Sequence, residues 1–112
     1  MTSDINNELE NTKAQLRKGA LEFSILLVIS KGEIYASDIL KKLTQAKLIV
    51  VEGTLYPILN RLKRAELLEY TWKESKSGPP RKYYNLTKKG EGMILKLKEA
   101  WKQLAQSIDS LA

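Results

Sequence analysis

The sequence predicts a mostly α-helical fold that contains one small β hairpin. Apolar residues recur at spacings of three and four in four separate segments, as in helices that bury one face. Residues 67–86 instead hold two strand-like runs on either side of a turn-forming segment. The chain has 112 residues, which is enough for one domain with one additional element.

Composition narrows the function before any element is placed. Cysteine and histidine are absent, which excludes disulfides, iron–sulfur clusters, nearly all zinc sites and nucleophilic catalysis by either side chain. The formal net charge is +6, and a pI near 9.5 points to a polyanion, nucleic acid before an anionic membrane. The longest apolar stretch is far shorter than the ~20 residues of a transmembrane helix. Without a signal-peptide pattern at residues 1–8, a cytoplasmic protein is expected.

The first predicted helix covers residues 11–30. Its expected apolar stripe consists of Leu16, Ala20, Phe23 and Leu27, widened by Ile25, Leu26 and Val28. Gly32 would end the helix. Residues 1–11 hold three acidic side chains and no basic one, and they are expected to be flexible or to extend the helix.

A second, shorter helix is predicted at residues 35–46, with Ser37 as a possible N-terminal cap. Its inward-facing residues are Ile39, Leu40 and Leu43. Residues 48–51 are too few for a helix, and they are interpreted as a short strand or an extended linker.

The third predicted helix covers residues 53–65, and Thr54 is its expected cap. Its buried stripe should consist of Leu55, Ile58, Leu59 and Leu62. Pro57 is tolerable if it lies in the first turn, because its missing N–H has no helical partner there.

The hairpin and the last helix complete the chain. Residues 67–72 and 81–86 are the expected strands, and residues 75–80, Ser-Lys-Ser-Gly-Pro-Pro, are the expected turn. Thr87 should cap a long final helix that ends near residue 110. The predicted boundaries are an acidic segment at 1–11, a winged helix-turn-helix domain at 12–87 and a C-terminal helix at 88–112.

Three helices followed by a hairpin is the order of a winged helix-turn-helix, whose third helix enters the major groove of DNA. Asn and Arg side chains match adenine and guanine edges, and basic side chains on a wing suit phosphates. Residues 73–89 carry six basic side chains against one acidic, although such a run is more often a solvated surface. The expected DNA contacts are Ser37, Thr54, Tyr56, Pro57, Asn60, Arg61, Arg64, Lys76, Arg81 and Lys82.

Residues 53–57 read Gly-Thr-Leu-Tyr-Pro, residues 59–62 read Leu-Asn-Arg-Leu, and residues 78–87 read Gly-Pro-Pro-Arg-Lys-Tyr-Tyr-Asn-Leu-Thr, followed by Gly90. In this order, over about residues 18–92, the motifs resemble the PadR family of transcriptional regulators. The resemblance implies DNA binding and regulation, most often repression. At residues 35–39 the chain has Tyr-Ala-Ser-Asp-Ile where the family usually has Tyr-Gly-Tyr-Glu-Ile, so contacts from the second helix are less secure than the fold.

The last helix carries a seam with the 3–4 spacing of a coiled coil. Its members are Ile94, Leu97, Trp101, Leu104, Ile108 and Leu111. This seam is longer than a winged domain needs for its own core, so a homodimer through this helix is predicted. The alternative is that the helix packs on its own domain. The family resemblance also implies dimerisation, in the branch of small proteins that have one C-terminal helix.

Trp101 lies in the middle of that seam and has two interpretations. It is either a packing anchor or, as the resemblance implies for some small family members, a platform on which planar aromatic ligands stack. No acidic residue lies on the seam within a turn of Trp101, so a preference for cationic ligands is not predicted. Trp72, in the first hairpin strand, is expected to be a packing residue.

Other functional classes find less support in the residues. No two carboxylates share an apolar helix face, and no glycine-rich phosphate loop occurs, so an enzyme is not expected. No cofactor or metal is expected either. The basic residues gather on a wing rather than along one amphipathic helix, which argues against a membrane-surface role. The remaining alternative is a winged helix that binds protein or RNA without recognising an operator.

Overall fold

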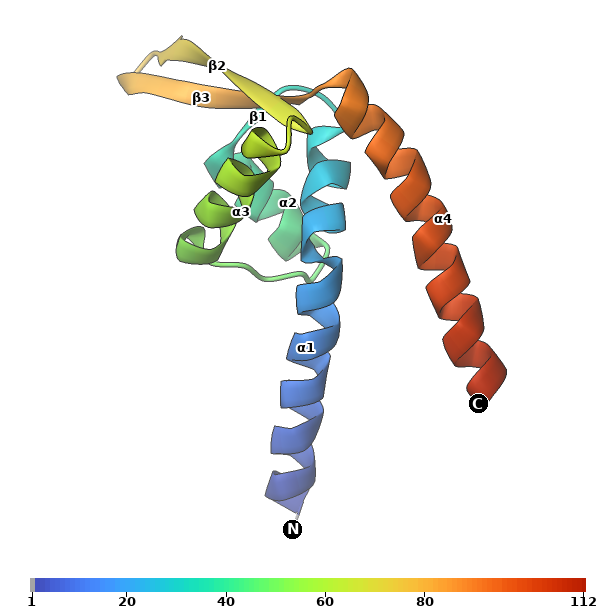
Figure 1. Ribbon diagram of the computed structural model, residues 1–112. Helices are drawn as coiled ribbons and strands as arrows, with labels where there is room; N and C mark the ends of the chain where they lie inside the picture. The colour runs from blue at the N-terminus through green and yellow to red at the C-terminus, as the bar shows by residue number, and fades with distance from the viewer. Residues whose placement is uncertain (1) are drawn as a thin grey trace.

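The computed structural model describes residues 2–112 and contains four helices and a three-stranded antiparallel sheet, with the helices and the hairpin in the predicted order (Figure 1). The helices are α1 (Thr2–Ile29), α2 (Ala36–Gln45), α3 (Glu52–Arg64) and α4 (Lys88–Leu111), and the strands are β1 (Ile34–Tyr35), β2 (Leu68–Ser75) and β3 (Gly78–Leu86). The winged helix-turn-helix order is therefore confirmed. No helix of the described residues is long and apolar enough to cross a membrane.

Helix α1 is much longer than the sequence pattern predicted. It begins at Thr2, so the acidic segment is a helical extension as far as it is described, and only Met1 lies outside the described residues. The extension projects from the domain with all side chains from Asp4 to Gly19 exposed. Gly32 follows the helix in a positive-φ conformation, which explains why a glycine ends it.

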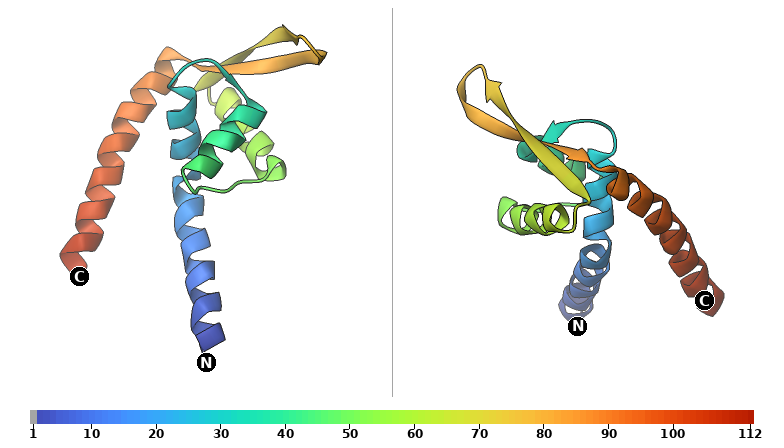
Figure 2. Two further views of the ribbon diagram at one scale, coloured as in Figure 1. Left: turned by 180° about the vertical axis from the view of Figure 1, so that it is seen from behind. Right: turned by 45° about the horizontal axis from the view of Figure 1, so that its top comes forward.

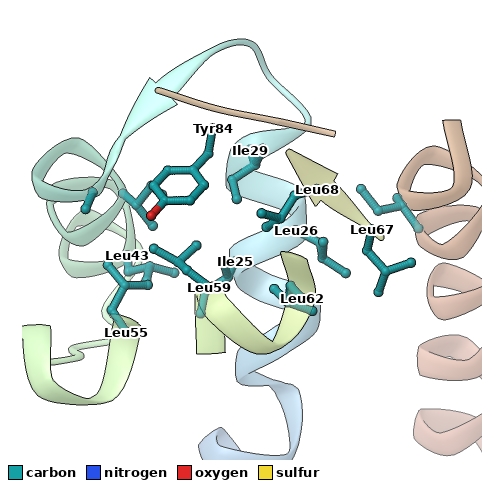
Figure 3. Close-up of a cluster of buried hydrophobic side chains, with 13 residues drawn as sticks. Ile25, Leu26, Ile29, Leu43, Leu55, Leu59, Leu62, Leu67, Leu68 and Tyr84 are labelled. Carbon is teal, nitrogen blue, oxygen red and sulfur yellow. The ribbon is translucent and has the colours of Figure 1, made fainter. Parts of the chain in front are cut away.

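The core uses only part of the apolar stripe predicted on α1. Ile25, Leu26 and Ile29 are almost fully buried, whereas Leu16 is 66% exposed. Of the predicted stripe, Ile25 and Leu26 therefore enter the core, whereas Phe23 and Leu27 are only half-buried. The remaining core residues come from α2, α3, β2, β3, α4 and the connection before β2 (Figure 3); they are Ala36, Ile39, Leu43, Leu55, Leu59, Leu62, Leu67, Leu68, Tyr84 and Ile94.

Helix α2 packs against α1 and the sheet, and α3 packs against α2 and β2. Ser37 and Thr54 do not cap their helices, because Tyr35 and Val51 occupy the N-cap positions and make no side-chain cap bond. Pro57 lies five residues after the first residue of α3 rather than in its first turn, so the Gly53 carbonyl receives no helical N–H from residue 57.

The hairpin is longer than predicted, and only Lys76 and Ser77 form its turn. Register explains how Pro79 and Pro80 fit into β3. Lys73 pairs with Arg81 and Ser75 with Gly78, so one residue of β2 faces both prolines in a bulge. The sheet order is β1-β3-β2, and β1, which was not predicted, covers β3 only at Tyr83 and Tyr84.

Helix α4 is anchored at its first turn. The Thr87 hydroxyl accepts a hydrogen bond from the Gly90 N–H at 3.0 Å and donates one to the Glu66 carbonyl at 2.6 Å, which confirms the predicted cap. Beyond this turn α4 diverges from α1, as both views of Figure 2 show. The radius of gyration is 16.5 Å, against about 13 Å for a compact domain of this length, because both helices project into solvent.

Candidate nucleic-acid interface

The outer surface of α3 carries the polar side chains that the sequence pattern assigned to DNA. Leu55, Leu59 and Leu62 bury the inner face. The hairpin of β2 and β3 is the wing, and the Lys63 ammonium lies 5.2 Å from the centroid of the Tyr70 ring on it. The predicted contact residues on α3 are all exposed: Thr54, Tyr56, Pro57, Asn60, Arg61 and Arg64. One helix surface therefore presents hydroxyl, amide and guanidinium groups together.

Arg61 differs from its neighbours because its guanidinium pairs with the Glu22 carboxylate of α1. Both side chains are 46% exposed, so the pair lies at the surface where α3 meets α1. In the part of the chain that the structure describes, Asn60 and Arg64 form no side-chain hydrogen bond or ion pair. Asn60 and Arg64 are therefore free to contact a ligand, whereas Arg61 must first leave Glu22.

The wing separates the two cations that the sequence placed side by side. Trp72 pairs with Lys82 and Lys73 with Arg81, and directly opposed residues share a face of the sheet while neighbours alternate. The Lys82 ammonium lies 4.6 Å from the Tyr70 ring centroid and 5.4 Å from the Trp72 ring centroid. Arg81 lies on the other face, 4.8 Å from the Tyr35 ring. Each cation is thus held against an aromatic surface.

Lys73 is neutralised by a carboxylate, whereas Lys76, Arg81 and Lys82 pair with none among residues 2–112. Its ammonium pairs with the Glu33 carboxylate, to which the Asn85 amide also donates a hydrogen bond at 3.2 Å. The hydrogen bonds from Lys73 and then Asn85 hold the pKa of Glu33 below its usual value. Lys76 is exposed in the hairpin turn. The positive charge available to a partner is therefore concentrated at the turn and along β3.

A hollow of about 470 Å³ lies between the wing, the first turn of α2 and α3. Its lining is aromatic, cationic and hydroxyl-bearing: Tyr35, Ala36, Ser37, Tyr56, Trp72, Pro80, Arg81, Lys82 and Tyr84. Tyr84, which also belongs to the core, is one of these lining residues, and burial raises the pKa of its hydroxyl. Four of the predicted contacts line this hollow, namely Ser37, Tyr56, Arg81 and Lys82, so the two cations leave β3 on opposite faces but border the same space.

Trp72 was wrongly predicted to be a packing residue. The side chain is 60% exposed, because β2 extends beyond the helices (Figure 1) and this part of its inner face covers no core. Tyr70 meets the indole edge-on, with 6.1 Å between ring centroids. Neither Trp72 nor Tyr35 was a predicted site residue. Only the pairing of the strands, which local patterns do not reveal, could have identified them.

The predicted dimer seam on α4 divides into two parts. Ile94 is 6% exposed and belongs to the core of its own chain, so its assignment to the dimer interface was wrong. Leu97 also packs against that core. Beyond them the seam is exposed at Trp101, Leu104, Ile108 and Leu111.

Helix α1 exposes a second apolar stripe, of which the sequence reasoning singled out only Leu16. Ile5, Leu9 and Leu16 are 69%, 52% and 66% exposed. Their spacing of four and seven places them on one helix face. The signal was present in the sequence, but it lay partly in the segment treated as a possible flexible end.

Comparison with known proteins places these features in a family. Residues 25–95 match the model of the transcriptional regulator PadR-like family. A PadR-like transcription factor from Bacteroides fragilis is 55% identical, and the match covers 91% of this chain and 99% of that one with a TM-score of 0.77.

Two further solved structures of PadR regulators are also similar to this chain over most of its length. A PadR-like transcriptional regulator from Bacillus cereus is 38% identical, with 87% and 95% of the two chains covered and a TM-score of 0.77. A PadR family regulator from Eggerthella lenta is 26% identical, with 95% and 89% covered and a TM-score of 0.84. Since the family model spans more than half of the chain and the likeness extends over nearly its whole length, the protein belongs to the PadR-like family of transcriptional regulators.

Proposed function

We propose that the protein is a homodimeric repressor that binds a specific DNA operator in the cytoplasm. The observation that carries this proposal is the joint exposure of Asn60 and Arg64 on α3, beside a wing whose cations Lys76, Arg81 and Lys82 have no carboxylate partner among the described residues. Asn and Arg present paired hydrogen-bonding groups to base edges. The wing cations suit the phosphates that flank the groove.

Dimerisation is supported by the two exposed apolar stripes. Trp101, Leu104 and Ile108 on α4 are each more than half exposed, and a monomer would leave them in water at a cost of ~25 cal/mol for each Å² of apolar surface. The N-terminal part of α1, which carries the other stripe, projects from the same side of the domain as α4 (Figures 1 and 2). We propose that α4 packs on its twin and on the partner's α1, which is acidic at its start, whereas α4 carries Lys96, Lys98 and Lys102.

The test of DNA binding is selection of duplexes from a random library, followed by binding measurements at several salt concentrations. An inverted repeat should emerge, with half-sites about one helical turn, ~34 Å, or a multiple of it apart. Asn60→Ala should reduce discrimination by ~1–3 kcal/mol at one position of the half-site.

Lys76→Ala is the matched comparison. It should weaken binding to all duplexes alike and lower the salt slope by about 0.9, the value for one phosphate contact. Enrichment of no duplex, or an affinity independent of salt, contradicts the proposal. Binding of structured RNA or of a protein in its place would favour the alternative winged-helix module.

The dimer is tested by charge substitutions on α4. Leu104→Glu and Ile108→Glu should each place an unpaired carboxylate in the interface, at a cost of several kcal/mol. Leu95→Glu is the control, because Leu95 is 69% exposed on the same helix but off the stripe. Sedimentation should show a monomer for the first two variants and a dimer for the control. A dimer that persists in all three places the interface elsewhere.

A planar aromatic effector between the two Trp101 rings stays a prediction, and what supports it is the 54% exposure of this ring on the stripe proposed to pair. Such a ligand would change the spacing of the two α3 helices only if its affinities for the two spacings differ. Fluorescence titration with planar dyes should show quenching that Trp101→Ala removes. Equal quenching in this variant would assign the signal to Trp72.

A further inference from the structure

The hollow between the wing and the helix-turn-helix pair has the chemistry of a nucleotide site. We propose that it binds one deoxyribose-phosphate unit of the operator backbone, with the Trp72 ring against the sugar and the Lys82 ammonium at the phosphate. This inference rests on the proposed DNA binding and assigns Trp72 a role in it. The volume of the hollow, about 470 Å³, lies within the ~300–1,000 Å³ usual for small-ligand sites.

The position of Trp72 is unusual for a packing residue. A large ring that is 60% exposed on a projecting strand gains little from burial within its own chain. Tyr70 nevertheless fixes its orientation through the edge-on contact. The indole is therefore a preorganised apolar surface at the edge of a cationic hollow, which suits the C–H groups of a deoxyribose.

Lys82 supplies the charge that such a unit requires. Two ring centroids lie within 5.4 Å of its ammonium, and no carboxylate pairs with it in the described part of the chain. The rings position the charge without cancelling it, whereas Glu33 neutralises Lys73 on the opposite face. The Lys82 ammonium can therefore donate hydrogen bonds to a phosphate. The side chains of Ser37 and Tyr56, which carry hydroxyls, line the same hollow.

The hollow is also in register with the proposed base-reading surface. Tyr56 lines the hollow, and Asn60 follows four residues later on the same helix face. A DNA strand whose base contacts Asn60 would therefore have its backbone near the hollow, because Tyr56 and Asn60 are one turn of α3 apart. A free nucleotide offers the same sugar and phosphate, but this neighbouring surface favours a polymer strand.

The experiment uses the intact protein carrying Trp101→Phe. Because the chain has two tryptophans, this substitution leaves Trp72 as the one source of tryptophan emission. Titration with the selected operator duplex should change the Trp72 emission in parallel with binding measured by anisotropy of the labelled duplex. Trp72→Ala should weaken binding to operator and random duplexes by the same factor, about threefold to tenfold, as expected for one aromatic contact that reads no base.

Two further variants sharpen the result. Lys82→Gln should lower the salt slope by about 0.9, one phosphate contact. Thr71→Ala is the matched control, because Thr71 is an exposed neighbour on the opposite face of β2 and should leave affinity and slope unchanged. Thermal unfolding of each variant verifies that it folds.

The outcomes separate the two proposals. Tight operator binding with unchanged Trp72 emission and full affinity of Trp72→Ala overturns the backbone site but leaves DNA binding intact. Absence of specific duplex binding overturns both. A deoxynucleoside monophosphate that quenches Trp72, when operator binding does not, shows that the occupant is a free nucleotide and also overturns the proposal.

Discussion

Gly90 lies where α4 leaves the wing, and Gly90→Ala tests how tightly that junction is built. A Cβ at this position would collide with the Leu67 carbonyl oxygen and lie 3.3 Å from Leu86 Cδ2. The backbone of Leu67 cannot yield cheaply, because its carbonyl also accepts a hydrogen bond from the Thr87 N–H at 3.2 Å. Overpacking of this kind costs ~1–3 kcal/mol, and displacement of the Thr87 cap adds ~1 kcal/mol.

The better helix propensity of alanine offsets at most ~1 kcal/mol. We therefore expect a net loss of ~1–3 kcal/mol, which for a domain of this length lowers the unfolding midpoint by roughly 4–13 °C. Circular dichroism during heating measures this loss, at one protein concentration because self-association shifts the midpoint.

Gly92→Ala is the control, since no atom lies within 4 Å of an added Cβ there. This change should raise stability by ~0.5–1 kcal/mol. A Gly90→Ala protein as stable as the Gly92→Ala protein would refute the close approach of α4 to Leu67.

Three further predictions follow from single contacts. Glu22→Gln frees Arg61 from its half-exposed ion pair, so stability should change by less than ~1 kcal/mol. The affinity for DNA should rise and its salt slope should steepen. Unchanged binding would show that Arg61 does not reach DNA. Because the pKa of Glu33 is lowered in the folded state, its contribution is present above the unfolded value of ~4.3 and is lost as pH falls through the folded value. The midpoint difference between the native protein and Glu33→Gln should therefore shrink on acidification, and a difference independent of pH would contradict the link to Lys73. Lys47 has φ of 63° after α2, so Lys47→Gly should stabilise the protein by ~1 kcal/mol in urea unfolding, and a loss of stability would disprove this reasoning.

The order and type of the main elements could be predicted because they follow from local patterns. Four helical periodicities, a proline-rich turn signal and the Thr87 cap are properties of neighbouring residues. The residues on the outer surface of α3 follow in the same way, since Leu55, Leu59 and Leu62 leave one direction for Asn60 and Arg64. Family membership agrees with this fold class and with the expectation that the chain is not an enzyme.

Features that depend on partners distant in the chain were not readable from those patterns. Helix α1 carries two apolar stripes, and the one that includes Leu16 stays exposed while Ile25 and Ile29 enter the core. The α4 seam is continuous in sequence, yet Ile94 packs within its own chain and Trp101 does not. Periodicity shows that a helix has an apolar face, but it does not show what that face will contact.

Some features of the candidate site likewise follow from local sequence patterns, and others depend on contacts between distant segments. The residue types that suit DNA, and the helix and hairpin that carry them, are visible in the order of the amino acids alone. The pairing of Arg61 with Glu22, the separation of Arg81 from Lys82 and the exposure of Trp72 required the folded chain. Each of these depends on how one element is positioned against another, and that position is set by the packing of the whole core rather than by any short segment.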